Sequence, residues 1–175
     1  MKTLIVIIVV VVAAVVLLAA VVALVGSRLP KEHSASRSIF LHQSPKQVYD
    51  VVRDFSAATS WRSDVKNIEV QNQPDGKIHF RENGPNGSVN YELAEDVPGK
   101  RMVTRILDTD LGYSGKWTYV FTPENGGTRV RITEDGEVSN VIFRFMSRYV
   151  FGQTATLDGY LTSLAKRFGE DVKPN

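Results

Sequence analysis

Several polar side chains that could take part in catalysis or binding occupy the same alternating sequence positions as the apolar residues around them. These side chains are Glu82, Tyr91, Thr104, Tyr119 and Glu134. Alternation with a period of two predicts strands, so all of them are expected on the inner face of a sheet. A carboxyl group beside tyrosine hydroxyls in an apolar pocket could act as a general acid or base. The plainer interpretation is that the two glutamates lie near strand ends and reach solvent there.

Other kinds of site are not indicated. The chain has no cysteine, and its histidines, His33, His42 and His79, do not have the spacing of metal ligands. The net charge is +2 (21 Lys and Arg against 19 Asp and Glu), with no basic run or aromatic ladder for nucleic acid. Phosphate-loop, nucleophile-elbow and dinucleotide-binding motifs do not occur. We therefore expect no metal, no cofactor and no nucleic-acid partner, and no motif identifies a catalytic residue.

The elements that must position these side chains are mostly strands. Residues 38–42, 65–71, 77–82, 88–95, 101–107, 116–122 and 128–134 alternate as strands, with turn signals between most of them. Glu124-Asn125-Gly126-Gly127 is a strong hairpin turn. Ser44 and Pro45 provide an N-cap and a first helical residue for a short helix. About seven strands in sequence predict an antiparallel meander within an α+β domain.

The apolar face of this sheet needs a cover, and residues 139–168 are the one helical pattern long enough. Its large side chains recur in steps of three, four and seven: Phe143, Met146, Val150, Leu157, Leu161, Leu164 and Phe168. Gly152 interrupts the stripe, and glycine costs about 1 kcal/mol relative to alanine inside a helix. We therefore expect a break near Gly152, with residues 140–151 over the mouth of a cavity and residues 154–168 packed on the sheet.

The N-terminus is the least ambiguous segment. Residues 4–25 are all apolar, without a charge or a glycine, and a helix of that length spans roughly the 30 Å of a bilayer core. A cleaved signal peptide is the alternative, but its apolar region is normally shorter. The expected organisation is a transmembrane anchor at 1–26, a tether at 27–36, one domain at 37–170 and a tail at 171–175. The flanking Lys and Arg residues lean slightly towards a cytoplasmic domain, without deciding the side.

Two local sequences resemble a known family. The first is Ser44-Pro45-Lys46-Gln47-Val48-Tyr49-Asp50-Val51-Val52-Arg53-Asp54-Phe55, followed by Trp61. The second is Gly115-Lys116-Trp117-Thr118-Tyr119-Val120-Phe121-Thr122-Pro123, followed by Gly126-Gly127-Thr128-Arg129-Val130. Together they resemble the polyketide cyclase/dehydrase and lipid-transport group of the SRPBCC superfamily, over about residues 36–170. The resemblance implies the helix-grip fold of START domains and the birch-pollen allergen: a curved sheet around a long C-terminal helix.

The resemblance also implies a cavity between the sheet and this helix. The residues expected to contact a ligand are Trp61, Phe80, Tyr91, Thr104, Tyr113, Trp117, Tyr119, Glu134, Phe143 and Met146. Three functions remain open. The leading hypothesis is a membrane-anchored binder or carrier of a hydrophobic small molecule, of the lipid or isoprenoid class. The alternatives are a polyketide cyclase or dehydratase, and an interaction domain whose core is filled by these same residues. Nothing in the sequence indicates the oligomeric state.

Overall fold

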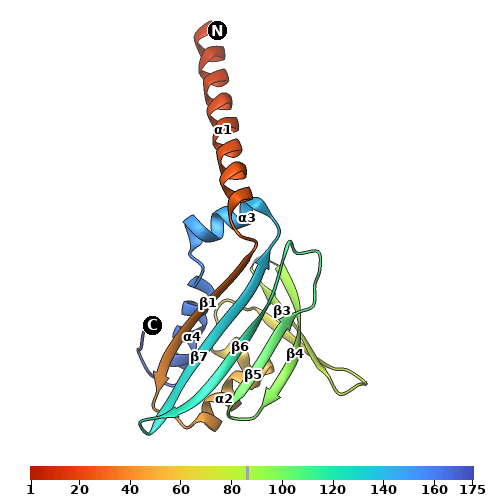
Figure 1. The fold of residues 1–175 in the computed structure, drawn as a ribbon, viewed down its shortest axis with the longest axis vertical. Helices are drawn as coiled ribbons and strands as arrows, with labels where there is room; N and C mark the ends of the chain where they lie inside the picture. The colour runs from red at the N-terminus through yellow and green to blue at the C-terminus, as the bar shows by residue number, and fades with distance from the viewer. Residues whose placement is uncertain (86) are drawn as a thin grey trace.

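The computed structural model describes residues 1–85 and 87–175 (Figure 1). Its helices are α1 (Lys2–Arg28), α2 (Pro45–Arg53), η1 (Phe55–Ser60), α3 (Val141–Met146), η2 (Ser147–Phe151) and α4 (Ala155–Arg167). Its strands are β1 (Glu32–Leu41), β2 (Asn67–Asn72), β3 (Ile78–Gly84), β4 (Gly87–Val97), β5 (Arg101–Ile106), β6 (Tyr113–Glu124) and β7 (Gly127–Val138). The seven predicted strands are present.

The strands form one antiparallel sheet in the order β1-β7-β6-β5-β4-β3-β2. β2 to β7 are a meander, and β1 joins the far side of β7. The register places Ile132 beside Tyr119 and Phe80 beside Tyr91, and these side chains share the inner face. The predicted α+β class and antiparallel sheet are confirmed.

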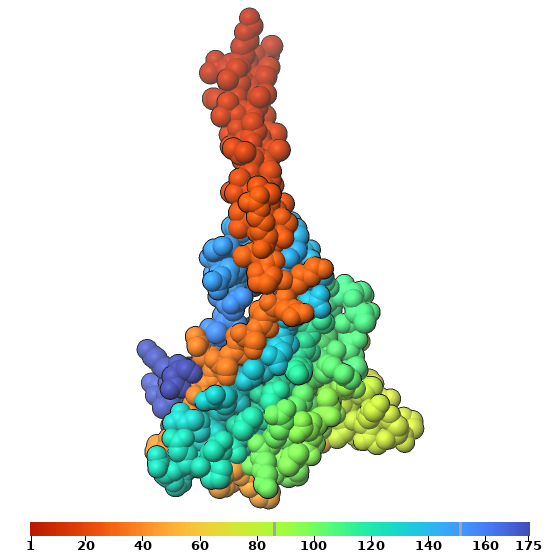
Figure 2. Space-filling model, in the orientation of Figure 1, coloured from red at the N-terminus to blue at the C-terminus, as the bar shows by residue number. Residues whose placement is uncertain are grey.

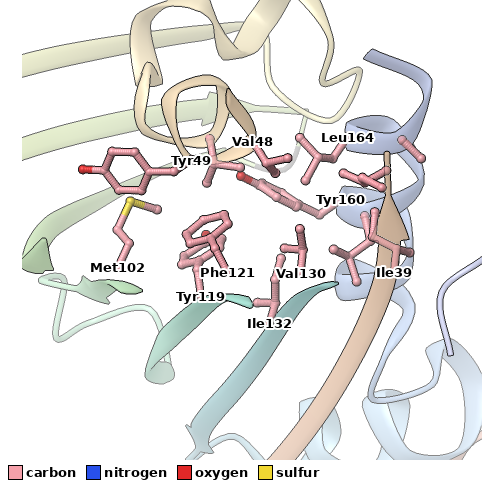
Figure 3. Close-up of a cluster of buried hydrophobic side chains, with 14 of the residues drawn as sticks. Ile39, Val48, Tyr49, Met102, Tyr119, Phe121, Val130, Ile132, Tyr160 and Leu164 are labelled. Carbon is pink, nitrogen blue, oxygen red and sulfur yellow. The ribbon is translucent and has the colours of Figure 1, made fainter. Parts of the chain in front are cut away.

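The core lies between the inner sheet face, α2 and α4 (Figure 3). Val48 of α2, Val130 of β7 and Leu164 of α4 are completely buried there. Full burial of a side chain of this size stabilises the fold by about 1.5–3 kcal/mol. α2 begins as predicted: Pro45 is its first residue, and Ser44 forms a capping box with Gln47.

The C-terminal helical region is broken where predicted. Gly152 has a φ of +80° between η2 and α4. Only glycine adopts this conformation at low cost, so the helix cannot continue through it. α4 packs on the sheet, whereas α3 and η2 lie at the end of the sheet nearest α1 (Figure 1).

The predicted tether at 27–36 is wrong for most of its length. α1 ends at Arg28 and β1 begins at Glu32, so Leu29, Pro30 and Lys31 are the whole connection. Glu32 to Ser36 pair with Glu137 to Thr133 of β7, which extends far enough to provide hydrogen-bond partners for this polar segment. This segment lacks the alternation of apolar and polar residues by which a strand is recognised in a sequence. The predicted tail also returns to the sheet, because the backbones of Asn175 and Ser38 exchange hydrogen bonds of 2.9 and 3.0 Å.

α1 projects away from the domain (Figures 1 and 2). It is long and apolar enough to cross a membrane, with a mean hydropathy of 3.7 over its most apolar window. Its base packs against α3 at Gly26, where an added Cβ would clash with the Val141 carbonyl oxygen. Glycine is therefore required at this contact between the two helices.

Candidate ligand site between the sheet and the C-terminal helix

The layer between the sheet and α4 has a closed end and a half-open end. Along β6, Phe121 and Tyr119 are 3% and 6% exposed, whereas Trp117 and Tyr113 are only half-buried. The same change occurs along β7 from the buried Ile132 to Glu134. The half-open end is the one near α3 and the base of α1. Apolar and aromatic side chains with a few polar groups are the usual lining of a small-molecule site.

An aromatic cluster around Tyr160 of α4 occupies the middle of this layer. The centre of the Tyr160 ring lies 5.3 Å from that of Trp61, 5.6 Å from that of Trp117 and 5.9 Å from that of Tyr119. These separations are typical of favourable edge-to-face and tilted aromatic pairs. Burial raises the pKa values of the Tyr119 and Tyr160 hydroxyls. Both hydroxyls therefore stay protonated at neutral pH and can donate hydrogen bonds.

The indole nitrogen of Trp61 is a polar atom without a partner in this cluster. Trp61 Nε1 is buried and has no hydrogen-bond acceptor among the described residues. A buried donor left unsatisfied costs about 1–3 kcal/mol. A hydroxyl or carbonyl oxygen on a bound molecule would satisfy it.

A charged group borders the cluster on the β2–β3 side. Arg62 donates hydrogen bonds to both carboxylate oxygens of Glu82, at 2.6 and 3.0 Å, and to Asp64. Its guanidinium carbon lies 5.1 Å from the centre of the Tyr160 ring. Burial acts to lower the pKa of Arg62, but the two carboxylates outweigh it and raise that pKa. Glu82 is thus the partner of a largely buried cation rather than a solvated residue at the rim.

Glu134 lies at the half-open end, opposite Trp117 on β6. His33 Nε2 is 3.5 Å from Glu134 Oε1, and 25% of the Glu134 side chain is exposed. Burial raises the pKa of this carboxyl, although His33 acts in the opposite direction. A carboxyl with a raised pKa beside a histidine is a suitable proton donor or acceptor.

Two hollows in the described part of the chain lie beside this layer rather than within it, and His33 lines both. One, of about 610 Å³, is lined by residues from β1, β5, β6 and β7, including Arg105, Lys116 and Asp135. The other, of about 380 Å³, lies between the start of β1 and the α3–η2 segment. Neither is lined by any of the predicted ligand-contacting residues. That these residues bind a ligand therefore stays a prediction.

Residues 32–169 match the family model described as polyketide cyclase/dehydrase and lipid transport. The chain belongs to this family. Its members form part of the SRPBCC superfamily, so the resemblance noted in the sequence is confirmed. No curated protein matches the chain.

Solved structures show the same fold at low sequence identity. A START superfamily protein from Mycobacterium smegmatis is 16% identical, with a TM-score of 0.60 over 77% of this chain and 96% of its own. The Zhui aromatase/cyclase from a Streptomyces species is 13% identical, with a TM-score of 0.61 over 78% and 96%. The di-domain aromatase/cyclase StfQ of steffimycin biosynthesis is 14% identical, with a TM-score of 0.61 over 79% of this chain. This chain spans 52% of StfQ.

Within this polyketide cyclase/dehydrase family domain, the structure brings most of the predicted residues onto one surface. Six lie on the inner sheet face: Phe80, Tyr91, Thr104, Trp117, Tyr119 and Glu134. Trp61 reaches the same layer through Tyr160. The other three are at the α3 end, where the rings of Tyr113 and Phe143 are 6.5 Å apart and Met146 is half-buried.

Sequence reasoning missed two residues of this layer. Tyr160 lies three residues after Leu157 and four before Leu164, so helical spacing alone could have placed it on the buried stripe. His33 was expected in the tether at 27–36, and no signal in the sequence paired it with Glu134. That contact depends on the pairing of β1 with β7 across about a hundred residues of chain.

Proposed function

We propose that this protein is a membrane-anchored domain that binds or carries a hydrophobic small molecule of the lipid or isoprenoid class. The observation that carries the proposal is the half-open end of the layer between the sheet and α4. Half-buried Tyr91 and Trp117 lie there on the inner sheet face, packed against the hydrophobic core. A molecule with an apolar body and one oxygen function would bury its body against these rings and could accept a hydrogen bond from Trp61.

Anchoring supports the choice of an apolar ligand. The half-open end faces the base of α1, so a molecule leaving the bilayer would have a short path to it. The packing of Gly26 against Val141 favours a retained anchor over a cleaved signal peptide, because removal of α1 would take away a packing partner of α3. The apolar composition of α1 is what a bilayer-spanning helix requires.

The two tryptophans of the chain offer a direct test, because both contact Tyr160 in this layer. Full-length protein in phosphatidylcholine nanodiscs would be titrated with a doxyl-labelled stearic acid, which quenches tryptophan at short range. We expect quenching to saturate as the probe fills the layer. Probe that stays dissolved in the bilayer adds quenching that increases with probe concentration without saturating.

A matched pair of substitutions locates the binding. Val89 is half-buried on β4 and shares the inner face with Tyr91, whereas Val97 is exposed at the other end of the strand. Val89→Phe should fill the half-open end and remove the saturable quenching, and Val97→Phe should leave it unchanged. Non-saturating quenching in the wild type and in both variants would contradict ligand binding. The interaction-domain hypothesis would then be favoured. Equal saturable quenching in both variants would contradict the proposed location.

A second candidate function, a cyclase or dehydratase acting on a polyketide-like chain, is favoured by one observation. Glu134 has a raised pKa and lies beside His33 at the half-open end, where a carboxyl could transfer a proton to or from a bound chain. Turnover of a poly-β-ketone would be measured by product mass, with Tyr91→Phe and Glu134→Gln as variants. We expect loss of turnover in Glu134→Gln if this function is correct. Unchanged turnover in both variants would remove the assignment.

A further inference from the structure

We propose that the end of the domain beneath α1 binds an anionic phospholipid of the bilayer, with the headgroup phosphate in a basic hollow and α3–η2 in the interface. This inference rests on the proposed anchoring by α1, but it does not depend on a ligand between the sheet and α4. It assigns a second lipid contact, at a different place and with different chemistry.

The hollow has the charge that an anion requires. It has a volume of about 380 Å³ and is lined by residues 29–34, Val138, Arg144, Ser147, Arg148 and Gln153. Lys31, Arg144 and Arg148 are cationic, against one acidic residue, Glu32. None of the three cations forms an ion pair within the described part of the chain.

Arg144 is the least expected of these cations, because it is only 8% exposed. Its Nη1 donates a hydrogen bond of 2.8 Å to the Leu29 carbonyl, and its buried Nε has no acceptor among the described residues. A guanidinium buried without a carboxylate is unfavourable unless another anion balances it. The planar fork of donors matches phosphate oxygens better than any other side chain does.

Apolar side chains surround this basic site on the side of α3–η2. Ile142, Phe143, Tyr149 and Val150 are each more than half exposed. The segment runs across the base of α1 (Figure 1) and contacts it at Gly26. If α1 crosses the bilayer, α3–η2 lies in its interface, where exposed apolar and tyrosine side chains are favourable and basic residues meet phosphates.

The test uses full-length protein in nanodiscs that contain equal parts of phosphatidylcholine and phosphatidylglycerol with identical acyl chains. Native mass spectrometry counts the lipids that remain bound after release. We expect retention of phosphatidylglycerol over phosphatidylcholine. Lys31→Gln with Arg148→Gln should lower that preference by about fivefold per charge, the effect of one basic residue near an anionic surface. Both residues are exposed, so the fold should tolerate the change.

The matched control is Lys66→Gln with Arg131→Gln, which removes the same charge from exposed positions outside the hollow. This control should keep the preference. Equal retention of the two lipids by the wild type, or equal loss in the two double variants, would overturn the inference. Competition by inorganic phosphate with no selective lipid retention would also overturn it, because the hollow would then be a site for free phosphate.

A second measurement tests the interface itself. The chain has no cysteine, so Ile142→Cys and Val97→Cys can each carry a single environment-sensitive fluorophore. Emission at position 142 should shift to the blue and be quenched by headgroup-labelled lipid, and emission at position 97 should do neither. Identical emission at both positions would contradict the interfacial placement. Alkaline carbonate extraction tests the anchor separately: protein that stays in the membrane without lipid selectivity would refute this inference and leave the proposed anchoring intact.

Discussion

The two ends of the layer between the sheet and α4 differ in how completely the protein surrounds their side chains. At the closed end, α2 and α4 cover the sheet, and Leu41, Val48 and Leu161 are completely buried. At the half-open end, the cover stops at Gly152, and half-buried Trp117 and Glu134 face inward without a complete protein environment. The closed end therefore contributes stability, whereas the half-open end is available for binding.

Arg62, which is largely buried, and Arg144, which is buried, differ in a similar way in their partners. Arg62, beside the aromatic cluster, has two carboxylate partners supplied by the chain. Arg144, at the α1 end, has a backbone carbonyl and no carboxylate among the described residues. Arg62 is neutralised by carboxylates of the chain itself, whereas Arg144 is the arginine for which we propose an external anion.

The largest expected effect is at the closed end. Leu161→Ala removes a completely buried side chain and should lower the free energy of unfolding by about 2–5 kcal/mol, since transfer and cavity costs add. Val150→Ala, at an exposed position, should change it by less than about 0.5 kcal/mol. Unfolding in mild detergent, followed by near-ultraviolet circular dichroism, measures both. Similar losses would show that the two ends are equally packed.

The next effect concerns the internal neutralisation of charge. Arg62→Met leaves Glu82 partly buried without its cation, so it should destabilise the fold by about 3 kcal/mol. The double variant with Glu82→Leu should recover much of that loss, because no unpaired carboxylate remains. A double-mutant cycle in denaturant measures the coupling. Additive losses would indicate that solvent screens this pair.

A smaller effect is expected where α1 meets the domain. Gly26→Val places side-chain atoms against the Val141 carbonyl and should cost about 1–3 kcal/mol by overpacking. The loss should appear as increased proteolysis near α3 and η2, while the closed end stays protected in hydrogen exchange. Equal protection of the α3 region in the variant and the wild type would show that α1 does not support this end.

The smallest effect is a pH dependence at Glu134. Its pKa is raised by burial, so its contribution to stability is complete below the ordinary carboxyl pKa of about 4.3 and is lost as the pH rises through the raised value. The glutamine in Glu134→Gln cannot ionise, so this variant should lose less stability than the wild type as the pH rises over the same range. Melting temperatures measured between mildly acidic and neutral pH test this. Parallel profiles for variant and wild type would contradict the raised pKa.

Local patterns in the sequence predicted the elements well. Strand alternation, the Ser44-Pro45 helix start and the break at Gly152 all depend on near neighbours, and all are present. The first half of β1 was missed because Glu32 to Ser36 are polar apart from Ala35, and their strand conformation depends on pairing with β7. Tyr160 was missed although its spacing from Leu157 and Leu164 was sufficient to find it.

The sequence by itself determined the order of elements, the apolar N-terminal helix and which face of each strand points inward. These depend on periodicity and on the preferences of single residues. Tertiary structure alone decided which end of the layer is open, that Arg62 pairs with Glu82, and that Arg144 is buried beneath α1 without a carboxylate. Each of these depends on contacts between distant segments. Burial of a charge is set by what surrounds it in space, which a linear pattern does not specify.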